Sequence, residues 1–148
     1  LTKALLDAGA HVKAIEKDDR LIPILGETFS KEISEGKLEI IHGDVLEAEI
    51  MTAMNLSSDN GSYKVIANIP YYITGQIIRT FLSMKAKPSI MILMVQKEVA
   101  TRIIARDGKE SILSLAVKVY ARPELVMNVS RGNFFPIPNV DSAVIKLS

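Results

Sequence analysis

Short apolar runs along the chain alternate with segments whose apolar residues recur at helical spacing. Strands are expected at residues 11–15, 38–41, 64–67, 88–95, 124–129 and 142–147. Helices are expected at residues 1–9, 18–33, 47–54, 74–84, 97–105 and 111–120, and a polar loop at residues 56–62. Near-continuous apolar strands separated by helices are typical of a mainly parallel sheet, so the pattern predicts an α/β fold. The last two strands have no helix between them and are expected to pair antiparallel.

Composition narrows the possible chemistry. With 48% hydrophobic residues in 148, the chain can bury the core of one ordinary domain. The absence of cysteine excludes disulfides, thiolate metal sites and cysteine nucleophiles, and it fits a reducing cytoplasm. His11 and His42 stand alone, so no metal site is expected. No apolar stretch is long enough to span a membrane.

The two halves of the chain differ in charge. Residues 1–78 contain seven Lys and Arg against twelve Asp and Glu, whereas residues 79–131 contain ten against four. The resulting net charges are −5 and +6. A basic half is what binding of a polyanion requires, although a solvated surface with scattered lysines would have the same count.

Polar residues follow three of the expected strands, at the sheet edge where open parallel sheets bind ligands. Glu16 can accept hydrogen bonds from both hydroxyls of a ribose, and Asp44 can accept one from the exocyclic amine of an adenine. Glu16 can equally cap the next helix, and Gly43-Asp44 can be a simple turn. Together the two acids suggest a cofactor that contains adenosine.

The sharpest signal is Asn68-Ile69-Pro70-Tyr71, directly after an apolar strand. An aromatic amine is a poor nucleophile, because its lone pair is delocalised into the ring. The Asn68 side-chain carbonyl and the Pro70 backbone carbonyl can hold such an amine and favour a tetrahedral nitrogen. Tyr71 offers a ring face on which an extruded base can stack, a role that does not need its hydroxyl. The alternative is a tight turn with a core tyrosine.

Five segments then resemble one family, the ribosomal RNA adenine dimethyltransferases. N-I-P-Y-Y-I-T-G (68–75) resembles the motif with which this family holds the target base. I-E-K-D-D-R-L (15–21) and G-D-V-L (43–46) resemble its ribose and adenine motifs. Q-K-E-V-A-T-R-I (96–103) is similar to its helix after the fifth strand, and F-F-P-I-P-N-V-D-S-A-V (134–144) to its closing signature. The matches span almost the whole chain in the family's order.

The resemblance implies a Rossmann-like class I methyltransferase fold that uses S-adenosylmethionine. Its sheet is mainly parallel, with one antiparallel strand. In this chain the family's roles fall on Glu16 for the cofactor ribose and Asp44 for the adenine amine. Lys17 and Val45 are expected to flank the adenine ring, and Asn68 to border the cofactor as well.

For the target base, the resemblance implies that Asn68, Pro70 and Tyr71 bind it and that Phe134 completes a sandwich. Either Phe134 or Phe135 is expected to belong to the core. Gln96 is expected beside the same cluster. The helix that it begins, through Arg102, can contact the RNA backbone or simply be a solvated charged face.

The family's glycine-rich loop is expected to precede Leu1, and its small helical domain to follow Ser148. Residues 1–148 are therefore expected to be one truncated catalytic domain without a second domain. The central first strand of the family's sheet (order 3-2-1-4-5-7-6) is missing, which predicts two separate sheet pieces. Loss of a buried strand exposes apolar surface, so the isolated chain is expected to be unstable or to aggregate.

Within the family, residues 71–74 and 108–115 are more similar to the housekeeping branch. That branch dimethylates two adjacent adenosines near the 3′ end of small-subunit ribosomal RNA. The expected partner is a small-subunit precursor particle, met by a cytoplasmic monomer. The alternatives are the antibiotic-resistance branch acting on large-subunit RNA, a DNA adenine methyltransferase, a non-catalytic nucleic-acid-binding relative and a nicotinamide-dependent enzyme.

Overall fold

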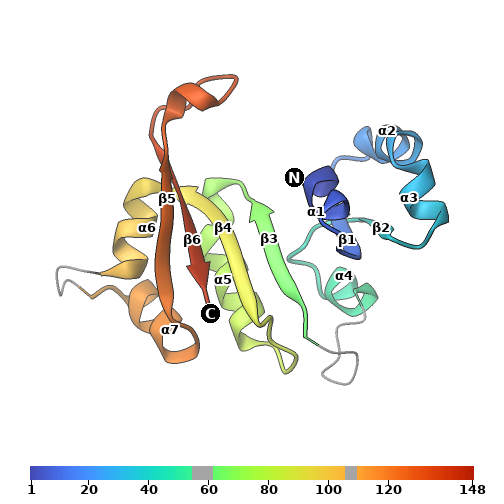
Figure 1. The fold of residues 1–148 in the computed structure, drawn as a ribbon. Helices are drawn as coiled ribbons and strands as arrows, with labels where there is room; N and C mark the ends of the chain where they lie inside the picture. Colours follow the sequence, from blue (N-terminus) through green and yellow to red (C-terminus); the bar gives the residue numbers. More distant parts are fainter. Residues whose placement is uncertain (55–61, 106–109) are drawn as a thin grey trace. The chain divides into compact units, whose positions relative to one another are not determined.

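The structure, a computed structural model, describes residues 1–54, 62–105 and 110–148. The predicted loop at residues 56–62 falls outside the described residues except for Ser62. The chain divides into two compact units, Leu1–Leu56 and Ser57–Ser148, here called the first and the second unit (Figure 1).

The first unit is built around two parallel strands. Its elements are α1 (Thr2–Asp7), β1 (Val12–Glu16), α2 (Leu21–Thr28), α3 (Ser30–Ser34), β2 (Leu38–His42) and α4 (Ala48–Ala53). Strands β1 and β2 pair in parallel from Val12 opposite Leu38 to Glu16 opposite His42. Helix α1 ends before Gly9, whose φ of +84° is a conformation that glycine adopts readily at helix ends.

The single helix predicted for residues 18–33 is wrong. Two shorter helices, α2 and α3, are separated at Phe29, where φ is −112° and ψ is 23°. The residues before Leu21 form a turn, in which the Asp18 carboxylate accepts from the Arg20 N–H at 3.0 Å and the Asp18 carbonyl accepts from the Leu21 N–H. Such local side-chain bonds compete with helical ones, which apolar spacing alone does not reveal.

The second unit contains a four-stranded sheet. Its elements are β3 (Lys64–Asn68), η2 (Tyr71–Ile73), α5 (Thr74–Ser83), β4 (Ile90–Gln96), α6 (Lys97–Ile104), α7 (Ile112–Tyr120), β5 (Pro123–Val129), η3 (Arg131–Asn133) and β6 (Ser142–Leu147). The strand order is β3-β4-β6-β5, with β3 and β4 parallel and β6 antiparallel to both neighbours. The predicted antiparallel pairing of the last two strands is confirmed. So is the prediction of two sheet pieces, because β1-β2 forms a sheet of its own.

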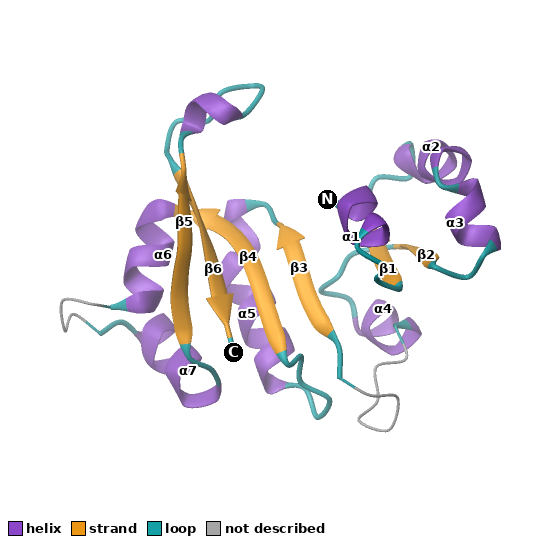
Figure 2. Ribbon diagram, in the orientation of Figure 1, coloured by secondary structure: helices purple, strands orange, loops and turns teal. Residues whose placement is uncertain are grey.

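One face of this sheet carries the core of the second unit. Along β4, fully buried residues alternate with half-buried ones, as expected for a strand packed more tightly on one side. The buried side chains Met91, Leu93 and Val95 lie opposite buried residues of β6. Helix α6 contacts β4, β5 and β6 and also packs on α7, which in turn contacts α5 (Figure 2). The predicted α/β architecture is thus confirmed. Strands β3 and β4, whose ends carry the candidate residues, belong to a sheet with a packed core.

Candidate active site

In the first unit, the two parallel strands end side by side. Glu16 lies opposite His42, and the Gly43 N–H donates to the Glu16 carbonyl at 2.9 Å, so the residues after both strands are tied together. Gly43 has a φ of +151°, and a Cβ built on it would lie 2.2 Å from the Ile50 Cδ1 atom. Only glycine fits this close approach without displacing Ile50, and it directly precedes Asp44.

The Glu16 side chain is half-buried and already oriented. One of its oxygens, Oε1, accepts from the Asp18 N–H at 2.8 Å. The alternative that Glu16 caps the next helix is wrong, because α2 has Arg20 as its N-cap and no side-chain cap bond, and the Glu16 bond instead lies in the turn before that helix. An ionised carboxylate has about four lone-pair sites, so this bond leaves Glu16 able to accept further hydrogen bonds.

Asp44 is held by two partners of the same unit. Its Oδ2 accepts from the Lys17 ammonium at 2.8 Å, and its Oδ1 accepts from the Leu46 N–H at 2.9 Å. The Lys17 hydrogen bond and then the Leu46 N–H hold the pKa of the Asp44 carboxyl below its ordinary value. The carboxylate is therefore firmly ionised at neutral pH, ready to accept an amine N–H. Val45, between these partners, is half-buried.

In the second unit, the loop after β3 is anchored at one residue and open at its neighbours. Asn68 ends the strand opposite Met94, and its side chain is exposed, with no hydrogen bond to any other described residue. Ile69 is buried and fastens the loop to the core. The Pro70 carbonyl accepts from the Ile73 N–H at 3.2 Å, which closes the short turn η2 and leaves the second lone pair of that carbonyl available.

Tyr71, in contrast, is fastened through its hydroxyl. Its Oη atom lies 2.6 Å from the Oγ atom of Ser142, the first residue of β6. Tyr71 is half-buried and Ser142 has no exposed surface, whereas the neighbouring Tyr72 is largely exposed. Stacking needs only the ring face of Tyr71, so the hydroxyl bond is a second, separate contact of this side chain.

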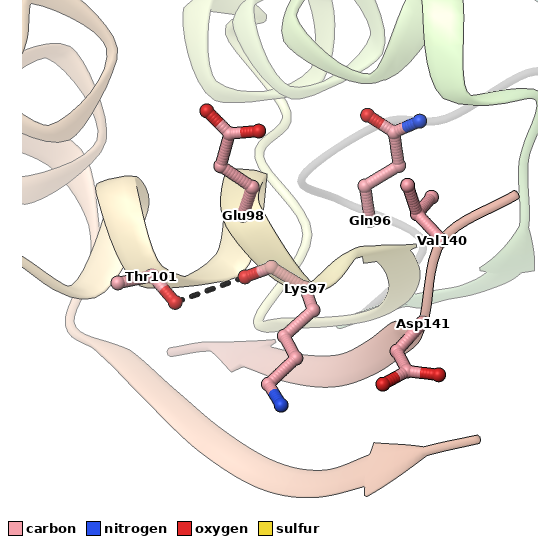
Figure 3. Close-up of a pocket in the computed structure, with 6 residues that line it drawn as sticks. All are labelled: Gln96, Lys97, Glu98, Thr101, Val140 and Asp141. Carbon is pink, nitrogen blue, oxygen red and sulfur yellow. Dashed lines mark hydrogen bonds between the residues drawn. The ribbon is translucent and has the colours of Figure 1, made fainter. Parts of the chain in front are cut away.

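Gln96, at the end of β4, lies opposite Ser142 in the antiparallel ladder, so both side chains stand on the same face of the sheet. Beside it is an open hollow of about 360 Å³ lined by Gln96, Lys97, Glu98, Thr101, Val140 and Asp141 (Figure 3). The Lys97 N–H donates to the Asp141 carbonyl at 3.0 Å. Gln96 thus lies where strand β4, helix α6 and the closing motif meet, close to the Tyr71 hydroxyl.

Phe134 lies on the connection between β5 and β6 and is half-buried, while Phe135 is fully exposed. The expectation that one of them belongs to the core is wrong. The connection projects beyond the sheet, and its base is tied by Asp141, whose Oδ1 accepts from the Arg131 N–H at 3.0 Å. Among the described residues, no aromatic ring contact joins Phe134 to Tyr71.

The predicted residues therefore form two groups, one in each unit. Glu16, Lys17, Asp44 and Val45 are together in the first unit. Asn68, Pro70 and Tyr71 share one loop of the second unit, whose sheet also carries Gln96, and Phe134 lies on the connection that leads into β6. No helix within the described ranges has the length and apolar character needed to cross a bilayer.

Asp141 and Ser142 belong to the closing motif, but the sequence pattern assigns no role to either of them. The signal was present, because a serine opens a mostly apolar strand, S-A-V-I-K-L, where a buried polar group needs a partner. The pairing of Lys17 with Asp44 was also missed, since Lys17 was expected to flank an adenine ring.

The family model described as "Ribosomal RNA adenine dimethylase" matches residues 1–148. A protein of Dehalococcoides mccartyi named "Ribosomal RNA small subunit methyltransferase A" is 40% identical over 148 residues, which cover all of this chain and 49% of that protein. A protein of the same name from Enterococcus faecalis is 40% identical over 151 residues, covering 50% of its length. The chain thus spans about half the length of the curated relatives it matches.

Two solved structures are similar. A dimethyladenosine transferase from Plasmodium falciparum matches with a TM-score of 0.70 and 30% identity, covering 92% of this chain and 46% of that one. The 23S rRNA methyltransferase ErmE matches with a TM-score of 0.78 and 28% identity, covering 99% of this chain and 55% of that one. With the strand order described above, these likenesses confirm the predicted class I methyltransferase fold.

Proposed function

Because this chain belongs to the ribosomal RNA adenine dimethylase family, we propose that it transfers methyl groups from S-adenosylmethionine to the N6 amino group of adenines in ribosomal RNA. The observation that carries the proposal is the loop after β3. It presents an exposed Asn68 carboxamide and an open Pro70 carbonyl beside a half-buried tyrosine whose hydroxyl is anchored.

The residues of the first unit suit the cofactor. Glu16 keeps acceptor sites for ribose hydroxyls after bonding to the Asp18 N–H, and Asp44 is held ionised to accept the adenine amine. We assign contacts with the adenine ring to Val45 and to the stem of Lys17, whose ammonium stays on Asp44. When bound, S-adenosylmethionine supplies an electrophilic methyl group on a sulfonium, which the adenine nitrogen takes up.

In the first methyl transfer to the target base, Asn68 Oδ1 and the Pro70 carbonyl each accept one of the two N6–H groups of the unmethylated adenine. These two bonds draw the amine toward a tetrahedral geometry, so that its lone pair is no longer shared with the ring. A strong base is unnecessary, because the nitrogen loses its proton to water after it has become cationic. Tyr71 and Phe134 hold the extruded base by stacking, and Asn68 also borders the cofactor.

We further propose that the target is the pair of adjacent adenosines near the 3′ end of small-subunit ribosomal RNA. The name shared by the bacterial relatives supports this choice. Adenines in a hairpin loop are already partly unstacked, so extruding them costs little. The likeness to the 23S rRNA methyltransferase ErmE makes large-subunit RNA the competing target.

The test uses the purified full-length gene product and radiolabelled S-adenosylmethionine. Three substrates are offered separately: small-subunit particles in which the two adenosines are unmethylated, large-subunit RNA, and duplex DNA. We expect label in small-subunit RNA, identified by mass spectrometry as N6,N6-dimethyladenosine. Label found only in large-subunit RNA, or only in DNA, would show that this nucleic acid is the target instead of small-subunit RNA. Cofactor binding without transfer would favour a non-catalytic nucleic-acid-binding protein.

The remaining parts of the proposal concern the protein's setting. We propose that it acts as a monomer in the cytoplasm on a precursor of the small ribosomal subunit, and that residues 1–148 serve as its catalytic domain. Light scattering of the purified protein, and its sedimentation with precursor particles in cell extracts, test these statements. A stable dimer, or no association with such particles, would contradict them.

A further inference from the structure

One contact joins two motifs that are 71 residues apart. The hydroxyl of Tyr71, in the loop after β3, lies 2.6 Å from the hydroxyl of Ser142, at the start of β6. Hydroxyl pairs at this distance are strong hydrogen bonds, and either oxygen can be the donor. The contact therefore fastens the loop that holds the target base to the sheet.

Ser142 is a fixed point. Strand β6 lies between β4 and β5, and Ser142 is opposite Gln96 on one side and Val129 on the other. Its side chain has 0% exposed surface. Because Ser142 is buried and its strand is paired on both sides, it has little freedom to move. The hydrogen bond therefore sets the orientation of Tyr71.

The contact is also one that the fold has reason to keep. A buried hydroxyl without a partner is destabilising, and Tyr71 is the only side chain bonded to the Ser142 hydroxyl in the part of the chain that the structure describes. With its backbone held by η2 and its hydroxyl held by Ser142, the Tyr71 ring is fixed at both ends. Tyr72 and Phe135 make no such bond among the described residues and project into solvent.

We propose that Ser142 is a positioning residue for methyl transfer, because it holds Tyr71 in the plane in which the target adenine stacks. This inference rests on the proposed function, in which Tyr71 is the stacking ring. A ring fixed in advance loses less rotamer freedom when the base arrives, so its orientation contributes to binding and to correct alignment of the amine.

The experiment compares wild type, Ser142→Ala, Tyr71→Phe and the double variant in the full-length protein. Both single variants remove the same hydrogen bond and keep the ring. We expect each to lower kcat/KM for the RNA about three- to tenfold, with the Kd for S-adenosylmethionine unchanged. The double variant is expected to be no worse than either single one, because the two changes remove one interaction. Ser142→Thr, which keeps a hydroxyl, is expected to regain most of the loss.

Ser114→Ala is the matched control for burial. Ser114 is also 0% exposed, but it lies on α7, where it bonds to Ser111 and Glu110 instead of Tyr71. This variant is expected to lower the melting temperature without changing kcat/KM for the RNA. If Ser142→Ala behaved like Ser114→Ala, its role would be structural only and the proposal would be overturned.

Tyr71→Phe decides the question even if Ser142→Ala does not fold, because it removes a single oxygen from a half-buried side chain. Wild-type kcat/KM in Tyr71→Phe would overturn the proposal. Tyr71→Ala separates this failure from that of the proposed function. If kcat/KM for the RNA fell in Tyr71→Ala but not in Tyr71→Phe, stacking by Tyr71 would be supported and positioning by Ser142 would be rejected. No transfer by the wild type would reject both.

Discussion

The two units hold their functional residues by different means. In the second unit a four-stranded sheet and helices α5, α6 and α7 contain most of the buried apolar side chains among the described residues, including those of β4 and β6. The described part of the first unit has two such side chains, Leu38 and Met54, and a sheet of two strands. A two-stranded sheet has little independent stability.

In the first unit, hydrogen bonds and an ion pair hold the functional side chains in place, whereas in the second unit packing contributes more. Glu16 is oriented by the Asp18 N–H, and Asp44 by Lys17 and the Leu46 N–H. Gln96 instead ends a strand of a sheet whose other face is close-packed, and Tyr71, in η2, is bonded to Ser142 of the same sheet. The proposed base site therefore rests on a packed sheet together with the bond between Tyr71 and Ser142, while the proposed cofactor site depends on a few local hydrogen bonds.

The largest effect is expected from the core of the second unit. Leu93 lies on β4 with 0% exposure, so Leu93→Ala removes buried packing and should lower the free energy of unfolding by about 2–5 kcal/mol, as measured by urea titration.

The matching change in the first unit is Leu38→Ala, which removes a leucine with 3% exposure. Hydrogen exchange should then increase in β1 and β2 and stay at its wild-type level in β4 and β6. Equal loss of protection in β1, β2, β4 and β6 would contradict the view that the two units are stabilised by separate sets of contacts.

Next in size is the effect of removing the amide that we assign to the base. Asn68→Ala should reduce turnover of RNA about a hundredfold or more, because the lost bond acts in the transition state. The Kd for S-adenosylmethionine, measured by calorimetry, should stay close to wild type. Asn128→Ala, an exposed asparagine on β5, is the matched control and should retain full turnover. Intact turnover in Asn68→Ala would disprove the assigned role.

A smaller effect is expected at the cofactor residue of the first unit. Glu16→Gln removes the charge that strengthens hydrogen bonds to ribose hydroxyls, so the Kd for S-adenosylmethionine should rise roughly tenfold. Glu39→Gln on β2 changes an exposed carboxylate that pairs with Lys13 at 3.0 Å, and it should leave this Kd unchanged. If both variants bound the cofactor like wild type, Glu16 would be only a cap for the turn at Asp18.

The smallest effect concerns the pairing of Lys17 with Asp44. The pKa of the Asp44 carboxyl is lowered in the folded protein, so its contribution to stability is present at neutral pH and is lost only as the pH falls through this lowered pKa. Lys17→Met should move the Asp44 pKa up toward its ordinary value, which NMR titration of the carboxyl carbon measures. Because Lys17 is largely exposed, stability at neutral pH should change by less than about 1 kcal/mol. An unchanged Asp44 pKa would assign the lowering to the Leu46 N–H alone.

Much of the fold was predictable because it follows from local pattern. Apolar runs and helical spacing located the six strands that the described residues form and most of their helices, and the missing helix between β5 and β6 predicted their antiparallel pairing. The late start of α2 at Leu21 was not predictable, because it depends on hydrogen bonds at Asp18 that apolar spacing does not encode, and the break at Phe29 left no mark in that spacing either.

The sequence by itself determined which polar residues end or follow the strands, because residue type and strand position are both local. Glu16, Asp44, Asn68 and Gln96 could be read directly from the chain. Only the tertiary structure decided which of these side chains are already bonded, and to what. The bond from Tyr71 to Ser142 and the pair of Lys17 with Asp44 join residues far apart in sequence. Such contacts depend on strand order and register, which come from packing between elements and leave no mark on the spacing within any one of them.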